Sequence, residues 1–144
     1  MKLKKSLGQN FLTDSFFLEK IIKSSQLNKF DNVIEIGPGD GALTELILKN
    51  SNSLTAIEID QRFSAKLKKR HIDDNFQIHN KDFLKIDLNE INFEDKVIIG
   101  NLPYNVSSQI IFRLLESNLK FKYCVFLIQK ELANRFLTNQ KATK

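Results

Sequence analysis

The sequence predicts an α/β fold with a doubly wound, mainly parallel sheet. Short apolar segments rich in β-branched residues alternate with segments of helical periodicity, and single helices between strands favour right-handed crossovers. A glycine-rich turn follows the first of these strands, at the sheet edge where such folds bind ligands. The 144 residues, 42% of them hydrophobic, suffice for one domain with its own core.

The expected elements follow one another along the chain. An amphipathic helix begins near Thr13 or Asp14 and buries Leu18, Ile21 and Ile22, which have helical spacing. Strands are expected at residues 33–36, 54–59, 76–78, 97–99 and 123–128, with helices at 42–49, 62–70, 107–117 and after residue 128.

Two local expectations concern the last helices and strands. Ser107 or Ser108 is expected to cap the helix that begins there, because serine is a preferred N-cap residue. Cys124 lies in an apolar segment and is the only cysteine, so we expect a buried, unreactive thiol and no internal disulfide.

Charge and hydropathy indicate which classes of partner the chain can bind. A net charge of +5 and a pI near 9.3 suit a polyanionic partner but do not require one. No apolar stretch has the length of a signal or a membrane span, so a cytoplasmic protein with no membrane partner is expected. His71 and His79 lack the spacing of metal ligands, and no metal is expected.

The glycine-rich turn predicts a nucleotide-type ligand. Gly37, Gly39 and Gly41 lie between a strand and a helix, so backbone can approach the ligand and the first helical amides point towards it. The spacing of Gly37, Gly39 and Ala42 also fits a dinucleotide fingerprint, and an NAD-dependent oxidoreductase is therefore an alternative. Asp40 would repel a pyrophosphate there. S-adenosylmethionine has no phosphate and carries cationic groups, so it is the favoured cofactor.

Acidic side chains follow the next two strands. Glu58 is assigned to the ribose hydroxyls, because the two oxygens of one carboxylate can accept from both. Asp60 is then expected to cap the following helix. Asp82 can accept from the exocyclic amine of the cofactor's adenine, with Phe83 packed nearby.

The segment Asn101-Leu102-Pro103-Tyr104 predicts chemistry at an amino group. An amine conjugated to a purine is a poor nucleophile until its lone pair is turned towards the methyl donor. The side-chain oxygen of Asn101 and the carbonyl of Leu102 can each accept one of its hydrogens and hold that geometry. Pro103 stiffens the turn, and Tyr104 offers a ring on which an extruded base can stack.

These motifs resemble those of the ribosomal RNA adenine dimethyltransferases, of the KsgA type and its erythromycin-resistance relatives. Asn101 to Tyr104 is similar to the Asn/Asp-Pro-Pro-Tyr motif of amino-methyltransferases, with Leu102 in place of the first proline. The segments Lys5 to Leu12 and Ile128 to Arg135 also resemble family signatures, and the forms of the first segment and the glycine turn favour the KsgA type.

The resemblance implies a Rossmann-like S-adenosylmethionine-dependent methyltransferase fold and a function. The implied enzyme dimethylates N6 of adjacent adenines near the 3′ end of small-subunit ribosomal RNA, free or in an assembling particle. A non-catalytic RNA-binding or ribosome-assembly protein of the same fold is a further alternative. The implied target adenine lies at Asn101, Leu102 and Tyr104, and the implied cofactor contacts are Asn10, the Leu12 backbone, Gly37, Glu58, Asp82 and Asn101.

The resemblance also implies that residues 1–144 are one incomplete catalytic domain. Members of the family carry further strands and a small helical C-terminal domain, which we expect this sequence to lack.

Overall fold

A computed structural model describes residues 11–142 of the chain and the side chains of residues 15–138. Within that range, five strands form one sheet in the order β3-β2-β1-β4-β5, and every neighbouring pair is parallel. The elements are α1 (Phe11–Ser25), β1 (Asn32–Ile36), α2 (Ala42–Asn50), β2 (Ser53–Glu58), α3 (Gln61–Arg70), β3 (Phe76–Asn80), the 3₁₀ turn η2 (Leu88–Glu90), β4 (Val97–Asn101), α4 (Ser107–Glu116), β5 (Tyr123–Leu127) and α5 (Lys130–Ala142).

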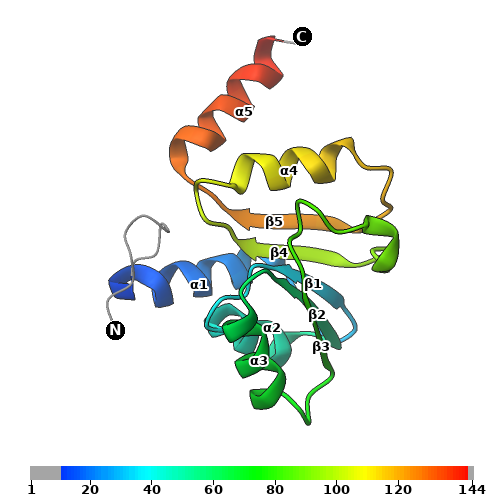
Figure 1. The fold of residues 1–144 in the computed structure, drawn as a ribbon. Coiled ribbons are helices and arrows are strands. Elements are labelled where there is room, and N and C mark those ends of the chain that lie inside the picture. Colours follow the sequence, from blue (N-terminus) through cyan, green and yellow to red (C-terminus); the bar gives the residue numbers. More distant parts are fainter. Residues whose placement is uncertain (1–10, 143–144) are drawn as a thin grey trace.

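Helices cover both faces of the sheet, which confirms the doubly wound fold. In Figure 1, α1 and α2 lie on one side of the strands and α4 on the other. Successive residues of β1 alternate between the two cores, because side chains of a strand point to opposite faces: Val33 packs with α1 and α2, and Ile34 packs with α4. Both residues are fully buried, as expected for the middle strand of a parallel sheet.

The strand order places the reversal of winding between β1 and β4. The chain moves outward from β1 through β2 to β3, and then returns to pair β4 with the other side of β1. In open parallel sheets, ligands bind outside the carboxyl ends of the strands at such a switch point. The fold therefore directs attention to the residues that follow β1 and β4.

Two local expectations were wrong. The N-cap of α4 is Val106, and no side chain caps this helix; the hydroxyl of Ser107 instead donates to the carbonyl of Tyr104 (3.1 Å). Cys124 is exposed, because β5 is an edge strand of the sheet formed by the described residues. The thiol of Cys124 is nevertheless partly shielded from water, and this desolvation raises its pKa.

Gly41, the N-cap of α2, combines a left-handed backbone with a crowded Cβ position. Its φ of 91° lies in the left-handed region, and an added Cβ would collide with the Leu67 side chain and lie 3.1 Å from Arg70 Nη1. Gly39 also has a positive φ (58°), but no atom lies within 4 Å of the position its Cβ would take. Substitution of Gly39 therefore tests backbone strain alone, whereas substitution of Gly41 tests strain and crowding together.

We expect Gly41→Ala to lower the free energy of unfolding by about 2–5 kcal/mol, since about 1–2 kcal/mol of backbone strain adds to about 1–3 kcal/mol of overpacking against α3. Gly39→Ala should lose only the strain, about 1–2 kcal/mol. Urea unfolding of both variants measures the difference. Equal losses would show that α3 does not pack against Gly41 as described.

Candidate functional site

The carboxyl ends of four neighbouring strands lie at one edge of the sheet. Gly37 follows β1, and Asn101 ends β4. The two strands approach closely here, because a Cβ added to Gly100 would lie only 3.0 Å from the carbonyl oxygen of Ile36. The glycine turn and the Asn101 turn, far apart in the sequence, are thus brought side by side as predicted.

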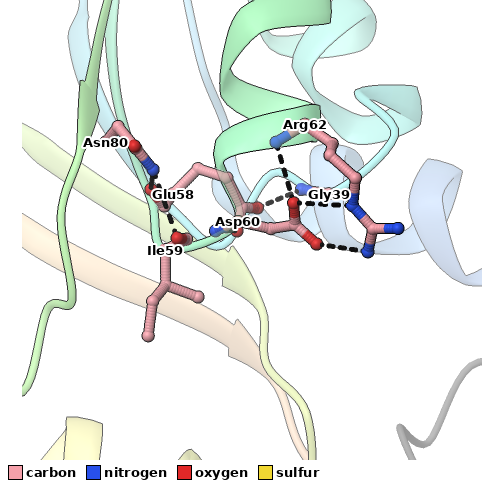
Figure 2. Close-up of polar contacts among 6 residues, drawn as sticks. All are labelled: Gly39, Glu58, Ile59, Asp60, Arg62 and Asn80. Carbon is pink, nitrogen blue, oxygen red and sulfur yellow. Dashed lines mark hydrogen bonds and ion pairs between the residues drawn. The ribbon is translucent and has the colours of Figure 1, made fainter.

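Glu58 connects the glycine turn to the end of β2. Its Oε1 accepts from the backbone N–H of Gly39 (2.8 Å), and its Oε2 accepts from the backbone N–H of Asp60 (2.8 Å). Figure 2 shows the carboxylate between these two groups. Glu58 is only 5% exposed, so the two charge-assisted hydrogen bonds offset much of the loss of hydration. Each oxygen keeps acceptor capacity for a ligand hydroxyl.

Asp60 has the expected capping role. It is the N-cap of α3, and its carboxylate accepts from the backbone N–H of Arg62 (2.8 Å) and pairs with the Arg62 guanidinium (2.9 Å). These hydrogen bonds from Arg62 lower the pKa of the Asp60 carboxyl. Asp60 is therefore occupied by the helix, which leaves Glu58 as the acid for the turn (Figure 2).

Sequence reasoning missed two residues beside Glu58. The side-chain amide of Asn80, at the end of β3, donates to the carbonyls of Glu58 (3.0 Å) and Ile59 (3.2 Å), and so fixes the end of β2 (Figure 2). Ile59 is 66% exposed, a large apolar side chain next to the glycine turn. Asn80 lies opposite Glu58 in the parallel register of β2 and β3. The sequence alone does not give this register, so it could not identify Asn80 as a neighbour of Glu58.

The glycine turn itself presents open backbone. Gly37 and Gly39 have positive φ values of 71° and 58°, and nothing lies within 4 Å of the positions their Cβ atoms would take. Asp40 is exposed, and its backbone carbonyl accepts from the Arg70 guanidinium (2.8 Å). The turn therefore forms an open cradle at Gly37 and Gly39, and the exposed carboxylate of Asp40 disfavours a phosphate placed next to it.

Asp82 and Phe83, after β3, have different surroundings. The Asp82 carboxylate is half-buried and accepts from the backbone N–H of Leu84 (2.9 Å), so it stabilises its own turn. Phe83, which is expected to pack near the adenine of the cofactor, is 4% exposed and belongs to the core, with the Arg113 guanidinium over its ring (5.7 Å).

The turn after β4 is anchored at one residue and open at two. Leu102 is buried in the core beside α4, and its backbone N–H donates to the carbonyl of Leu127 (3.4 Å). Asn101 is exposed, and the Tyr104 side chain is 45% exposed. The turn therefore leaves two polar or aromatic side chains exposed at the end of β4, on either side of a buried leucine that anchors it.

Two of the expected cofactor contacts lie at or before the first described residues. Asn10 lies outside the described residues, and Leu12 lies in the first turn of α1, where only the backbone is described. Among the described residues, no group of three or more His, Cys, Asp or Glu side chains could hold a metal ion. None of the helices in residues 11–142 has the length and apolar character to span a membrane.

Comparison with curated proteins finds close relatives. Ribosomal RNA small subunit methyltransferase A of Mycoplasma mobile is 44% identical over 135 residues, which cover 93% of this chain and 52% of that protein. The protein of the same name from Streptococcus thermophilus is 44% identical over 139 residues, covering 92% and 48%. The chain thus spans about half the length of the curated relatives it matches.

Solved structures share the fold. A dimethyladenosine transferase from Plasmodium falciparum superposes with a TM-score of 0.73 at 34% identity, over 85% of this chain and 44% of the other. The 23S rRNA methyltransferase ErmE superposes with a TM-score of 0.71 at 28% identity, over 86% and 50%. The sheet is therefore the Rossmann-like fold of the methyltransferases, as predicted.

The family model described as ribosomal RNA adenine dimethylase matches residues 1–144, the whole of this chain. Its match agrees with the close relatives and with the two solved structures. The chain belongs to the ribosomal RNA adenine dimethylase family.

Proposed function

We propose that the chain carries the cofactor site and the catalytic turn of a ribosomal RNA adenine-N6,N6-dimethyltransferase. The single observation that carries the proposal is the position of the Asn101–Tyr104 turn beside the glycine turn, on one sheet edge of a chain of this family. The name of the relatives, ribosomal RNA small subunit methyltransferase A, supports small-subunit ribosomal RNA as the substrate. Within that RNA, free or in an assembling particle, we propose adjacent adenines near the 3′ end as the targets.

The residues at the glycine turn fit S-adenosylmethionine. The cradle at Gly37 and Gly39 is open where side chains would otherwise stand, and Glu58 retains lone pairs for ribose hydroxyls. Ile59 offers an exposed apolar surface beside it, suited to the flat adenine of the cofactor. When bound, S-adenosylmethionine supplies the electrophilic methyl group. Asp40 favours this cationic cofactor over the pyrophosphate of NAD.

The turn after β4 would orient the target amine. The side-chain oxygen of Asn101 and the backbone carbonyl of Leu102 would each accept one hydrogen of the adenine amino group, which directs its lone pair away from the protein acceptors and towards the methyl group. The same acceptors stabilise the positive charge that develops on nitrogen. Burial of the Leu102 side chain keeps its backbone in place, so little reorganisation is needed.

The half-exposed ring of Tyr104 would receive the extruded base. Stacking of a base on an aromatic side chain contributes about 1–3 kcal/mol in single-stranded sites. The hydrogen bond from the Ser107 hydroxyl to the Tyr104 carbonyl (3.1 Å) holds the backbone of this residue against the start of α4. The backbone that carries the ring is therefore already in place, and binding loses little backbone entropy.

Methyl transfer from labelled S-adenosylmethionine to small ribosomal subunits that lack the modification tests the proposal. We expect labelled dimethyladenosine on nucleoside analysis of the RNA. Subunits already modified are the control and should take up no label. Binding of the cofactor without any transfer would contradict the proposal that this chain carries the catalytic turn, and label in another nucleoside would contradict the adenine assignment.

Asn101→Ala is expected to lower the rate of methyl transfer about 100- to 1000-fold, the range found when one preorganised polar contact is removed from a transition state. The melting temperature should stay close to that of the wild type, because Asn101 is exposed. Asn105→Ala, an exposed residue of the same turn, is the matched control and should retain the rate. An Asn101→Ala variant with wild-type kcat would remove this residue from the mechanism.

Glu58→Gln is expected to weaken binding of S-adenosylhomocysteine about tenfold or more. The amide NH₂ would face a backbone N–H where the carboxylate accepts, so one charge-assisted hydrogen bond, about 1.5–3 kcal/mol, is lost. Calorimetry measures the affinity.

Asp60→Ala is the control for Glu58→Gln. It should lose the α3 cap, about 0.5–2 kcal/mol of stability, with little change in affinity. If the two variants lost affinity equally, Glu58 would have no special part in the site.

A further inference from the structure

A buried hydrogen bond joins β1 to α2 at the base of the glycine turn. The hydroxyl of Thr44 donates to Glu35 Oε1 (2.6 Å), and the two residues are 0% and 1% exposed. Glu35 lies in β1, shortly before Gly37 in the chain. Thr44 lies in the first turn of α2, shortly after Gly41. The bond therefore connects the two ends of the segment Gly37–Gly41. The Glu58 carboxylate in turn binds the middle of this segment at the Gly39 amide.

The position of Glu35 keeps water away from its carboxyl group. It lies in the middle strand of the sheet, with Ala56 of β2 and Ile99 of β4 as its neighbours in register. Burial is the main cause that raises the pKa of Glu35 from 4.5 to about 8, although the Thr44 hydrogen bond acts in the opposite direction. The carboxyl group is therefore neutral in the folded protein at pH 7.

Two other carboxylates surround the same turn. Glu58 of β2 and Asp40 of the turn both raise the pKa of Glu35 through their negative charge. Glu58 accepts two backbone N–H groups, an arrangement that requires acceptors and suits an ionised carboxylate. A neutral Glu35 removes the repulsion that Glu58 would otherwise experience. The negative charge is thereby concentrated on the two carboxyl groups that border the proposed cofactor site.

We propose that neutral Glu35, together with Thr44, is the positioning element that keeps the glycine turn in its cofactor-binding shape, and that ionisation of Glu35 loosens the turn. Glu35 would not touch the cofactor; it acts through the turn. This inference rests on the proposed function, because it assigns the turn to S-adenosylmethionine. Under this inference, the site binds the cofactor only while the Glu35 carboxyl group is protonated.

The direction of the pH dependence follows from the raised pKa. In the unfolded chain Glu35 ionises near pH 4.5, whereas in the folded chain it keeps its proton up to about pH 8. Its contribution to stability is therefore greatest below pH 4.5 and declines as the pH rises from 4.5 to 8. Above about pH 8 the native state itself loses the proton, and the turn is then expected to open.

Affinity for S-adenosylhomocysteine, measured by calorimetry from pH 6.5 to 9.5 with Glu35→Gln as the comparison, tests the inference. The glutamine side chain is uncharged and keeps an oxygen that accepts from Thr44, so this variant should bind at pH 7. We expect the wild type to lose about tenfold more affinity than Glu35→Gln for each pH unit above 8. The amino group of the ligand titrates equally in both proteins, so the comparison cancels it.

A second pair of variants tests the hydrogen bond itself. Thr44→Val removes the donor with little change of shape, whereas Thr44→Ser keeps it. We expect Thr44→Val to weaken binding about tenfold at pH 7, in line with a lost hydrogen bond of about 1.4 kcal/mol, and Thr44→Ser to restore it. Thermal melting checks that all variants are folded.

Each outcome of these measurements has one meaning. Identical pH profiles of the wild type and Glu35→Gln, or wild-type affinity in Thr44→Val, would overturn the role of Glu35 and leave the proposed function intact. A folded wild-type chain that bound no S-adenosylhomocysteine at any pH would contradict the proposed function, and this inference with it.

Discussion

The hydrogen bonds of the Glu58 carboxylate are the interaction on which the rest of the site depends. One oxygen accepts from the amide of Gly39 and the other from the amide of Asp60, so a single buried side chain fixes the turn after β1 relative to the end of β2. Asn80 then ties the end of β2 to the end of β3. A buried carboxylate without such partners would be strongly unfavourable. The ends of three strands are thereby held in one arrangement.

The order of the strands places the turn at Asn101, after β4, next to the turn at Gly37, after β1. Because the sheet winds outward from β1 and then returns to its other side, β4 lies next to β1. Gly100 allows the close approach, since any side chain there would meet the carbonyl of Ile36 and the side chains of Leu102 and Phe126. Asn101 follows at once. Residues more than 60 positions apart in the chain, Gly37 and Asn101, thus border one site.

The fold was predictable because the local signals agreed with one another. Segments such as Val33 to Ile36 are too short for helices and rich in β-branched residues, and the glycines mark the first crossover. The detailed contacts of the site were not predictable. The partners of Glu58 depend on the curvature of the turn, the burial of Phe83 depends on the position of α4, and the Ser107 hydroxyl found a carbonyl acceptor instead of a helix N–H. These are tertiary effects that override local preference.

Under the proposed function, the turn at Gly37–Gly41, the end of β2 and Asn101 form a single site for S-adenosylmethionine. Backbone amide NMR of the labelled chain, titrated in parallel with S-adenosylhomocysteine and with NAD, tests this claim most directly. We expect saturable shifts for S-adenosylhomocysteine at Gly39, Asp60 and Asn101 together, with no saturable response to NAD. Shifts confined to one of these turns, or a tighter response to NAD, would contradict the claim of a single S-adenosylmethionine site.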